Sequence, residues 1–288
     1  MTYNYYPGCS LHHMSVEYHL STRAVFRHLG IRLQEIDDWN CCGASAAHAT
    51  DEYLALALPL RNLILAEKTG YDVLVPCAAC YNVFRLADHE VRKGDARAKR
   101  VNHELEGLLG FPYRASLKIK HALEPFGEKE VLDNLAEHVT VPLEGLRVAS
   151  YYGCLLSRPP AVVAFDNPEQ PCLMDRLMER LGARVVRWSY KTDCCGASLT
   201  VAQPEHVNRL VGMLVREARR AGAEAIVTAC PLCQSNLESR QGEAEDKMPV
   251  FFFTELVGVA LGIRESKQWF SKHLHDPQPL LQSLRLIG

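Results

Sequence analysis

The sequence predicts an α/β protein made of two duplicated domains, each a small, mostly parallel sheet with flanking helices, related by pseudo-twofold symmetry. Ten of the eleven cysteines fall on two copies of one pattern, which predicts the duplication. Short segments rich in β-branched and aromatic residues alternate with segments of helical periodicity, which is typical of parallel sheets. A chain of 288 residues is long enough for two domains of ordinary size.

The two copies of the cysteine pattern share their order and one of their spacings. The first copy comprises Cys9, Cys41, Cys42, Cys77 and Cys80, and the second comprises Cys154, Cys194, Cys195, Cys230 and Cys233. In both copies a Cys-Cys-Gly run is followed, after 33 residues, by a Cys-x-x-Cys pair. We place the boundary in the stretch 142–145, which gives domains 1–143, including a helical connecting segment at 91–140, and 144–288.

The predicted elements bring the cysteines together. Strands are expected at 3–6, 71–75, 147–151, 184–188 and 225–228, and helices at 16–29, 52–68, 173–181 and 205–221. Each cysteine group follows a predicted strand, and ligands of open α/β sheets sit beyond the carboxyl ends of the strands. The three groups of each half are therefore expected to converge on one point. The two points should form separate pockets, each local to its half, that face a shared gap.

Composition excludes several classes of protein. A net charge of −2 and a pI near 6.6 give no basic face for nucleic acid. The N-terminus lacks a signal-peptide pattern, so a cytoplasmic location is expected. The apolar stretch 250–263 is too short for a membrane span and is expected to form a buried or subunit-facing helix. Because cytosolic thiols stay reduced, clustered cysteines there indicate metal or redox chemistry.

Iron–sulfur clusters explain the cysteine sets better than other uses of thiols do. Disulfides would leave an odd cysteine in each set of five, and structural zinc takes only four ligands. Adjacent cysteines project in different directions, which suits two irons of a cluster better than one tetrahedral ion. Zinc in place of one cluster stays open, because thiolates suit both. The usual ferredoxin run is absent, which predicts a ferredoxin-like partner. Cys172 stands outside both sets and is expected to be an ordinary thiol.

Three motifs in the sequence resemble the B subunit of heterodisulfide reductase. They are Tyr-Tyr-Pro-Gly-Cys-Ser at 5–10, Trp-Asn-Cys-Cys-Gly-Ala-Ser at 39–45 and Val-Pro-Cys-Ala-Ala-Cys at 75–80, and the second half carries another Cys-Cys-Gly set. The resemblance implies two CCG domains, each holding a non-cubane [4Fe-4S] cluster on its five cysteines. It also implies cleavage of the disulfide between coenzyme M and coenzyme B. Electrons would come from the A subunit, a flavoprotein, through the C subunit, a ferredoxin-like chain.

Reduction of a disulfide takes two electrons and two protons, so proton donors are needed beside the cysteines. His12, His13 and His48 lie near cysteine groups in sequence and are candidate donors. Arg158 and Lys191 are candidates for binding an anionic substrate.

Other functions remain open from the sequence. The chain could be a related subunit that oxidises sulfur compounds, an electron-transfer subunit of a dehydrogenase complex, or a zinc-bound scaffold.

Overall fold

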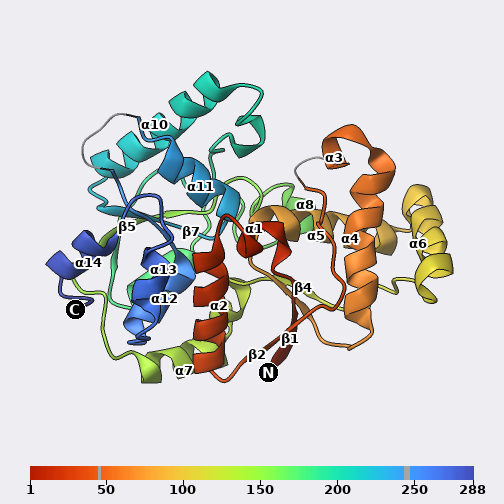
Figure 1. Ribbon diagram of the computed structural model, residues 1–288, viewed down its shortest axis with the longest axis horizontal. Helices are drawn as coiled ribbons and strands as arrows, with labels where there is room; N and C mark the ends of the chain where they lie inside the picture. Colours follow the sequence, from red (N-terminus) through yellow and green to blue (C-terminus); the bar gives the residue numbers. More distant parts are fainter. Residues whose placement is uncertain (45–46, 243–246) are drawn as a thin grey trace.

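The computed structural model describes residues 1–44, 47–242 and 247–288, and each half is built on a four-stranded parallel sheet (Figure 1). The strand orders are β2-β1-β3-β4 and β6-β5-β7-β8, so the strands correspond one to one. The first sheet comprises β1 Thr2–Tyr5, β2 Arg32–Glu35, β3 Val73–Val75 and β4 Ile119–His121. The second comprises β5 Arg147–Tyr151, β6 Arg184–Val185, β7 Ala225–Thr228 and β8 Val250–Phe252. The predicted duplicated α/β fold is confirmed.

Helices flank both sheets. The first half contains α1 Gly8–His12, α2 Val16–His28, α3 Ala47–Thr50, α4 Glu52–Glu67, α5 Ala78–Lys93, α6 Ala96–Leu109, the 3-10 helix η1 Glu124–Gly127 and α7 Lys129–His138. The second contains α8 Pro160–Val163, α9 Leu173–Arg180, the 3-10 helix η2 Ala197–Leu199, α10 Pro204–Arg220, α11 Pro231–Ser239, α12 Phe253–Ala260, α13 Ser266–Phe270 and α14 Gln278–Ser283. The four predicted helices are confirmed as α2, α4, α9 and α10, with ends within one residue.

Three predicted segments differ from the structure. The stretch 250–263 begins with strand β8, and the buried helix α12 follows it, because an apolar run alone does not distinguish the two. The segment 91–140 contains strand β4 as well as helices. Strand β6 covers only Arg184–Val185 of the expected 184–188, and β2, which has one hydrophobic residue in four, was not predicted.

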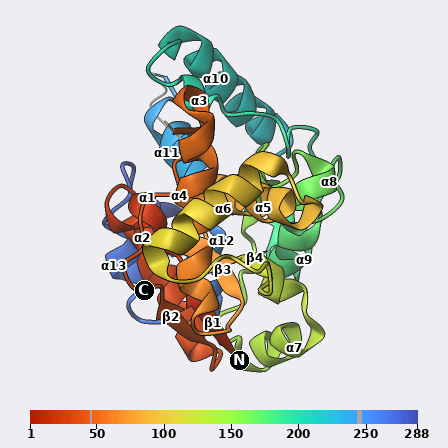
Figure 2. The same cartoon turned by 90° about the vertical axis from the view of Figure 1, so that its right-hand side faces the viewer.

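The two halves pack together through α2 and α12, which lie side by side (Figures 1 and 2). The ring of Tyr18 on α2 stacks on Phe252 with centroids 4.1 Å apart. The hydroxyls of Ser21 and Thr254 hydrogen-bond at 2.7 Å, and both side chains are buried. One hydrophobic core therefore runs through both halves. In the described part of the chain, no helix has the length and apolar character to cross a membrane.

Candidate metal centre

All ten patterned cysteines lie beyond the carboxyl ends of parallel strands. Cys77 is the N-cap of α5, directly after β3, and Cys230 is the N-cap of α11, directly after β7. The second cysteine of each of these pairs lies one turn into the same helix. The Cys-Cys-Gly runs occupy the loops after β2 and β6. Three chain segments thus converge at each sheet edge, as the sequence predicts.

The same thiol pairs meet in both halves. In the first half, the Sγ atoms of Cys9 and Cys41 are 3.9 Å apart, and those of Cys42 and Cys80 are 3.1 Å apart. In the second half, the matching distances are 3.8 Å for Cys154–Cys194 and 3.6 Å for Cys195–Cys233. All eleven cysteines are free thiols. In each half the outer pair reaches the surface, and the three inner thiols are buried.

The two cysteine sets approach each other at one residue from each, Cys77 and Cys230. The Cys230 thiol raises the pKa of Cys77, and the Cys233 and Cys77 thiols lower the pKa of Cys230, so Cys77 and Cys230 lie close to each other. Both residues are buried, with 2% of their surface exposed. Buried thiols of the two sets therefore lie close to each other where the halves meet, and the outer pair of each set lies toward the surface.

Glycines leave room beside the inner thiols. Gly8 and Gly153, which precede the first cysteine of each set, both have φ +68°. A Cβ on Gly8 would lie 3.2 Å from the Cys80 Sγ, and one on Gly153 would lie 3.1 Å from the Cys233 Sγ. Both positions therefore require the absence of a side chain as well as a left-handed backbone.

Backbone N–H groups and neighbouring thiols favour the thiolate at several positions. The Gly196 N–H donates to the Cys194 Sγ at 3.2 Å. The Cys154 thiol, together with this N–H, lowers the pKa of Cys194 to about 6. The Cys41 and Cys80 thiols hold the pKa of Cys42 well below its usual range. The partner thiols Cys41 and Cys154 have raised pKa values, so one thiol of each pair retains its proton more strongly than the other. N–H donors to sulfur are typical of thiols that hold iron–sulfur clusters.

These residues fit an iron–sulfur cluster in each half. Each set offers five soft thiol ligands and a space beside an inner thiol that a Cβ on Gly8 or Gly153 would fill. Backbone N–H groups also donate to the sulfur atoms. Among the described residues, no group of three or more His, Cys, Asp and Glu side chains is arranged around a single metal-ion position.

The candidate histidines occupy different places. His12 and His13 are exposed at the end of α1. The His12 Nε2 is 3.4 Å from a Glu35 carboxylate oxygen, and its ring packs on Trp39 at 5.3 Å between centroids. The side chain of His48 lies outside the described residues. The structure therefore places His12 in a defined setting beside the first set, while the role of each histidine stays a prediction.

The two candidate cations have partners within the chain. Lys191 forms an ion pair with Asp175, and both are largely buried. Arg158 donates to the Pro168 carbonyl and to the Glu169 carboxylate, each at 2.8 Å. Lys191 is therefore occupied in holding the loop that precedes Cys194, and Arg158 is only partly free for a substrate.

Sequence reasoning missed the side chains that brace the cysteine loops. The Tyr6 hydroxyl donates to the Asn40 carbonyl at 2.8 Å, and the Tyr151 hydroxyl donates to the Asp193 carbonyl at 2.7 Å. Each carbonyl belongs to the residue directly before a Cys-Cys-Gly run. The signal was present in the sequence, because a tyrosine stands three residues before the first cysteine of both sets.

Comparison with known proteins identifies the family. The model of the CCG cysteine-rich domain matches residues 3–85 and 148–238, so this is a protein with two cysteine-rich domains. The chain belongs to the family of the heterodisulfide reductase B subunit. It is 30% identical, over 84% of its length, to the B subunit of a ferredoxin/F420H2-dependent CoB-CoM heterodisulfide reductase of Methanosarcina acetivorans, of which it covers 83%.

Two further comparisons add to this. The chain is 31% identical to an 8-methylmenaquinol:fumarate reductase membrane anchor subunit of Wolinella succinogenes, covering 96% of this chain and 98% of that protein. A crystal structure of a hypothetical protein from Helicobacter pylori superposes with a TM-score of 0.77 at 14% identity. That likeness covers 96% of this chain but only 52% of the Helicobacter protein, and it supports the fold alone. Together, the family and the cysteine sets indicate an oxidoreductase subunit that binds iron–sulfur clusters and transfers electrons as part of a complex.

Proposed function

We propose that this chain is the iron–sulfur catalytic subunit of a heterodisulfide reductase-like complex and that it reduces a small disulfide of the coenzyme M–coenzyme B type to two thiols. One observation carries the proposal: two sets of five cysteines converge with matching thiol pairs beyond corresponding strands, and they approach each other at Cys77 and Cys230. The five thiols of each set would hold one [4Fe-4S] cluster of non-cubane form. When bound, each cluster supplies one-electron transfer, so the pair supplies the two electrons that a disulfide takes.

The thiols of each set differ in their exposure to solvent, and this difference assigns them different roles. Cys9, Cys41 and Cys194 are exposed, so a docked partner can approach them. The inner thiols lie in a nonpolar interior where water is excluded. His12 is exposed to solvent and held near Glu35, so it can take up a proton from water and deliver it at the edge of the first set.

The proposed partners follow from the family. Relatives of this chain are named as components of heterodisulfide reductases. We place a ferredoxin-like chain, the C subunit of such a complex, against the exposed thiols. A flavoprotein, the A subunit, would supply the electrons, and we place the complex in the cytoplasm. A related subunit that oxidises a sulfur carrier would use the same residues in the opposite direction.

A second candidate function is electron transfer within a complex of the fumarate reductase type. It is favoured by the 31% identity to the Wolinella succinogenes protein, which extends over nearly the full length of both chains. In that case the two cysteine sets would mark a path for electrons between partners, and no disulfide substrate would be needed.

Anaerobic purification of the affinity-tagged chain from its host tests the proposal. The flavoprotein and the ferredoxin-like chain should copurify, and the complex should oxidise reduced viologen dye when the coenzyme M–coenzyme B disulfide is added. Cys42→Ser should abolish this activity, and Cys172→Ser should retain it, because only Cys42 belongs to a set. A fumarate- or succinate-linked flavoprotein in place of these two partners, with no response to the disulfide, would support the second function and refute the first.

A further inference from the structure

A buried histidine and a buried tyrosine bridge the two halves at the residues that precede Cys77 and Cys230. His121 ends strand β4, and Tyr18 lies in the first turn of α2. Both are fully buried. Both reach the same two carbonyl oxygens, those of Pro76 and Ala229. These are the residues directly before Cys77 and Cys230.

The hydrogen bonds fix the protonation of the histidine. Its Nε2 lies 2.7 Å from the Pro76 oxygen and 3.1 Å from the Ala229 oxygen. Its Nδ1 accepts the Leu123 N–H at 3.1 Å, so Nε2 carries the proton and donates to the two carbonyls. Burial lowers the pKa of His121 to about 4, which keeps the ring neutral at ordinary pH.

The tyrosine adds a second donor at the same place. Its hydroxyl is 3.1 Å from the Pro76 oxygen and 3.5 Å from the Ala229 oxygen. Its ring is held by the stack on Phe252. Two carbonyl oxygens that approach from different halves repel each other. A hydrogen-bond donor placed between them attracts both and so replaces the repulsion with attraction. The junction therefore depends on these two side chains more than on direct contact between the two strand ends.

We propose that Tyr18 and His121 are a positioning pair that sets the separation of Cys77 and Cys230 and, through them, of the two cysteine sets. Each carbonyl is one residue from its thiol, so a shift of either strand end moves the thiol with it. The separation matters for turnover only if electrons pass between the sets, and in this respect the inference rests on the proposed function. The geometric claim itself concerns the chain's own atoms.

The test is therefore made on the metal-free chain. Diamide, an azodicarboxamide oxidant, takes two electrons and two protons from a pair of thiols and leaves a disulfide and a hydrazine. The peptide linked through Cys77 and Cys230 is then measured by mass spectrometry. Tyr18→Phe, which removes one hydroxyl and keeps the ring, should lower the yield about fivefold. Tyr18→Phe combined with His121→Leu should lower it further.

Tyr113→Phe is the matched control, because its buried hydroxyl donates to Asp88 at 2.8 Å in the same half, away from the junction. It should leave the yield unchanged while destabilising the fold by a similar amount. Equal yields in the wild type and in both junction variants would overturn the inference. An equal loss in Tyr113→Phe would do so as well, because it would trace the effect to general stability. No iron is present, so the result does not depend on the proposed function.

A separate observation concerns the outer edge of the first sheet. The Arg32 N–H donates to the Met1 carbonyl, directly before β1, and the Ile36 N–H donates to the Tyr5 carbonyl at its end. Successive residues of a strand direct their N–H and C=O groups to opposite sides. The N–H and C=O groups of Leu33 and Glu35 therefore point away from the sheet, where an added strand could bind them. The matching edge strand of the second sheet, β6, is only two residues long.

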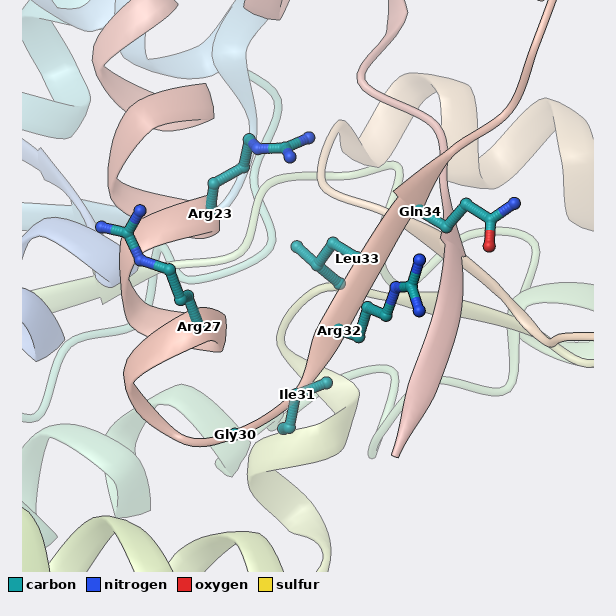
Figure 3. Close-up of a pocket in the computed structure, with 7 residues that line it drawn as sticks. All are labelled: Arg23, Arg27, Gly30, Ile31, Arg32, Leu33 and Gln34. Atoms are coloured by element: carbon teal, nitrogen blue, oxygen red, sulfur yellow. The ribbon is translucent and has the colours of Figure 1, made fainter.

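Arginines line a groove beside this edge. The groove lies between α2 and β2, has a volume of about 530 Å³, and includes Arg23, Arg27 and Arg32 in its walls. In Figure 3, Arg23 extends from α2 above the groove, and Leu33 points from β2 toward the helix. Arg23 and Arg27 each form a long, solvent-exposed ion pair, Arg23 with Glu35 at 3.9 Å and Arg27 with Glu265 at 3.8 Å. These arginines are only weakly neutralised.

We infer that an acidic, extended segment of a partner protein adds to β2 as a fifth strand. The strand edge supplies main-chain hydrogen bonds, and the arginines select acidic side chains on the face turned toward α2. Every second residue of the segment faces the groove. Charge complementarity therefore favours alternating acidic and apolar residues.

Fluorescence anisotropy with a labelled heptapeptide of alternating glutamate and valine tests this second inference. The peptide should bind, and a peptide with lysine in place of glutamate should not. Arg23→Glu with Arg27→Glu should weaken binding at least tenfold. Leu33→Pro, which removes an outward N–H, should abolish it, whereas Leu33→Ala should leave it detectable. Equal binding of both peptides, unchanged binding to Leu33→Pro, or dimerisation of the chain through the groove would contradict the inference.

Discussion

Replacing His273 with glutamine should destabilise the protein more than any exposed histidine substitution. His273 follows α13 and lies between two carboxylates, with Nδ1 2.6 Å from Glu238 and Nε2 2.9 Å from Glu255. The side chains of His273 and Glu255 are fully buried, and that of Glu238 is 5% exposed. A third buried carboxyl, Glu17 on α2, is close enough to sense all three charges.

The size of the loss in folding free energy follows from the two buried carboxylates that would lose their cation. Burial opposes the charge on His273, but the two glutamates outweigh it and raise the pKa to about 11. Glutamine would leave two buried carboxylates without a cation, and breaking a buried pair in this way costs about 3–5 kcal/mol. The pKa of His273 in the folded protein lies above its unfolded value of about 6.5. Its contribution to the free energy of unfolding is therefore fully present below pH 6.5. It declines as the pH rises toward 11. The variant should lack this decline.

Urea unfolding followed by tryptophan fluorescence at pH 6 and pH 9 measures both effects. His103→Gln is the control, because His103 pairs with Glu106 at 3.4 Å on the surface and is 86% exposed. Its loss should change the free energy of unfolding by less than about 1 kcal/mol. A His273→Gln effect equally small, or one that grows from pH 6 to pH 9, would refute the argument.

Two further predictions concern the cysteine sets. Cys42→Ser should remove the iron of the first set and leave that of the second, as measured by iron content and EPR. The control Cys172→Ser should keep all iron. Unchanged iron in Cys42→Ser would count against a five-ligand site. Gly153→Ala should lose the iron of the second set, because the new Cβ would lie 3.1 Å from the Cys233 Sγ in a left-handed backbone. Gly110→Ala is the control, because Gly110 has φ +87° but open space around it. This variant should lose about 1 kcal/mol of folding free energy and retain all iron. Equal iron content in both alanine variants would show that the space beside the Cys233 thiol is not needed.

The sequence predicted the duplication and the convergence of the cysteines because both depend on repeated local spacing. The Cys-Cys-Gly runs and the strands before Cys77 and Cys230 could be recognised without knowledge of how the halves pack. Strand β4 could not, because it has three residues with Lys120 in the middle and lies in a segment otherwise helical. Strand β8 merges with the apolar start of α12, so neither length nor composition separates them.

The contacts between the halves were not predictable from one sequence. His121 lies 41 residues after Cys80, outside every repeated motif, and only the docking of β4 against the second half brings it to Ala229. The proximity of Cys77 and Cys230 depends on the same docking. His273 was missed for a similar reason, because its partners come from α11 and α12.

Metal and sulfide content of the anaerobically purified chain tests the central claim most directly. Two [4Fe-4S] clusters predict about eight iron and about eight acid-labile sulfide per chain. Their reduced EPR signals should broaden one another, because the two cysteine sets lie close together at Cys77 and Cys230. Zinc without sulfide, or two signals that show no mutual interaction when both sets are fully loaded and reduced, would contradict the account.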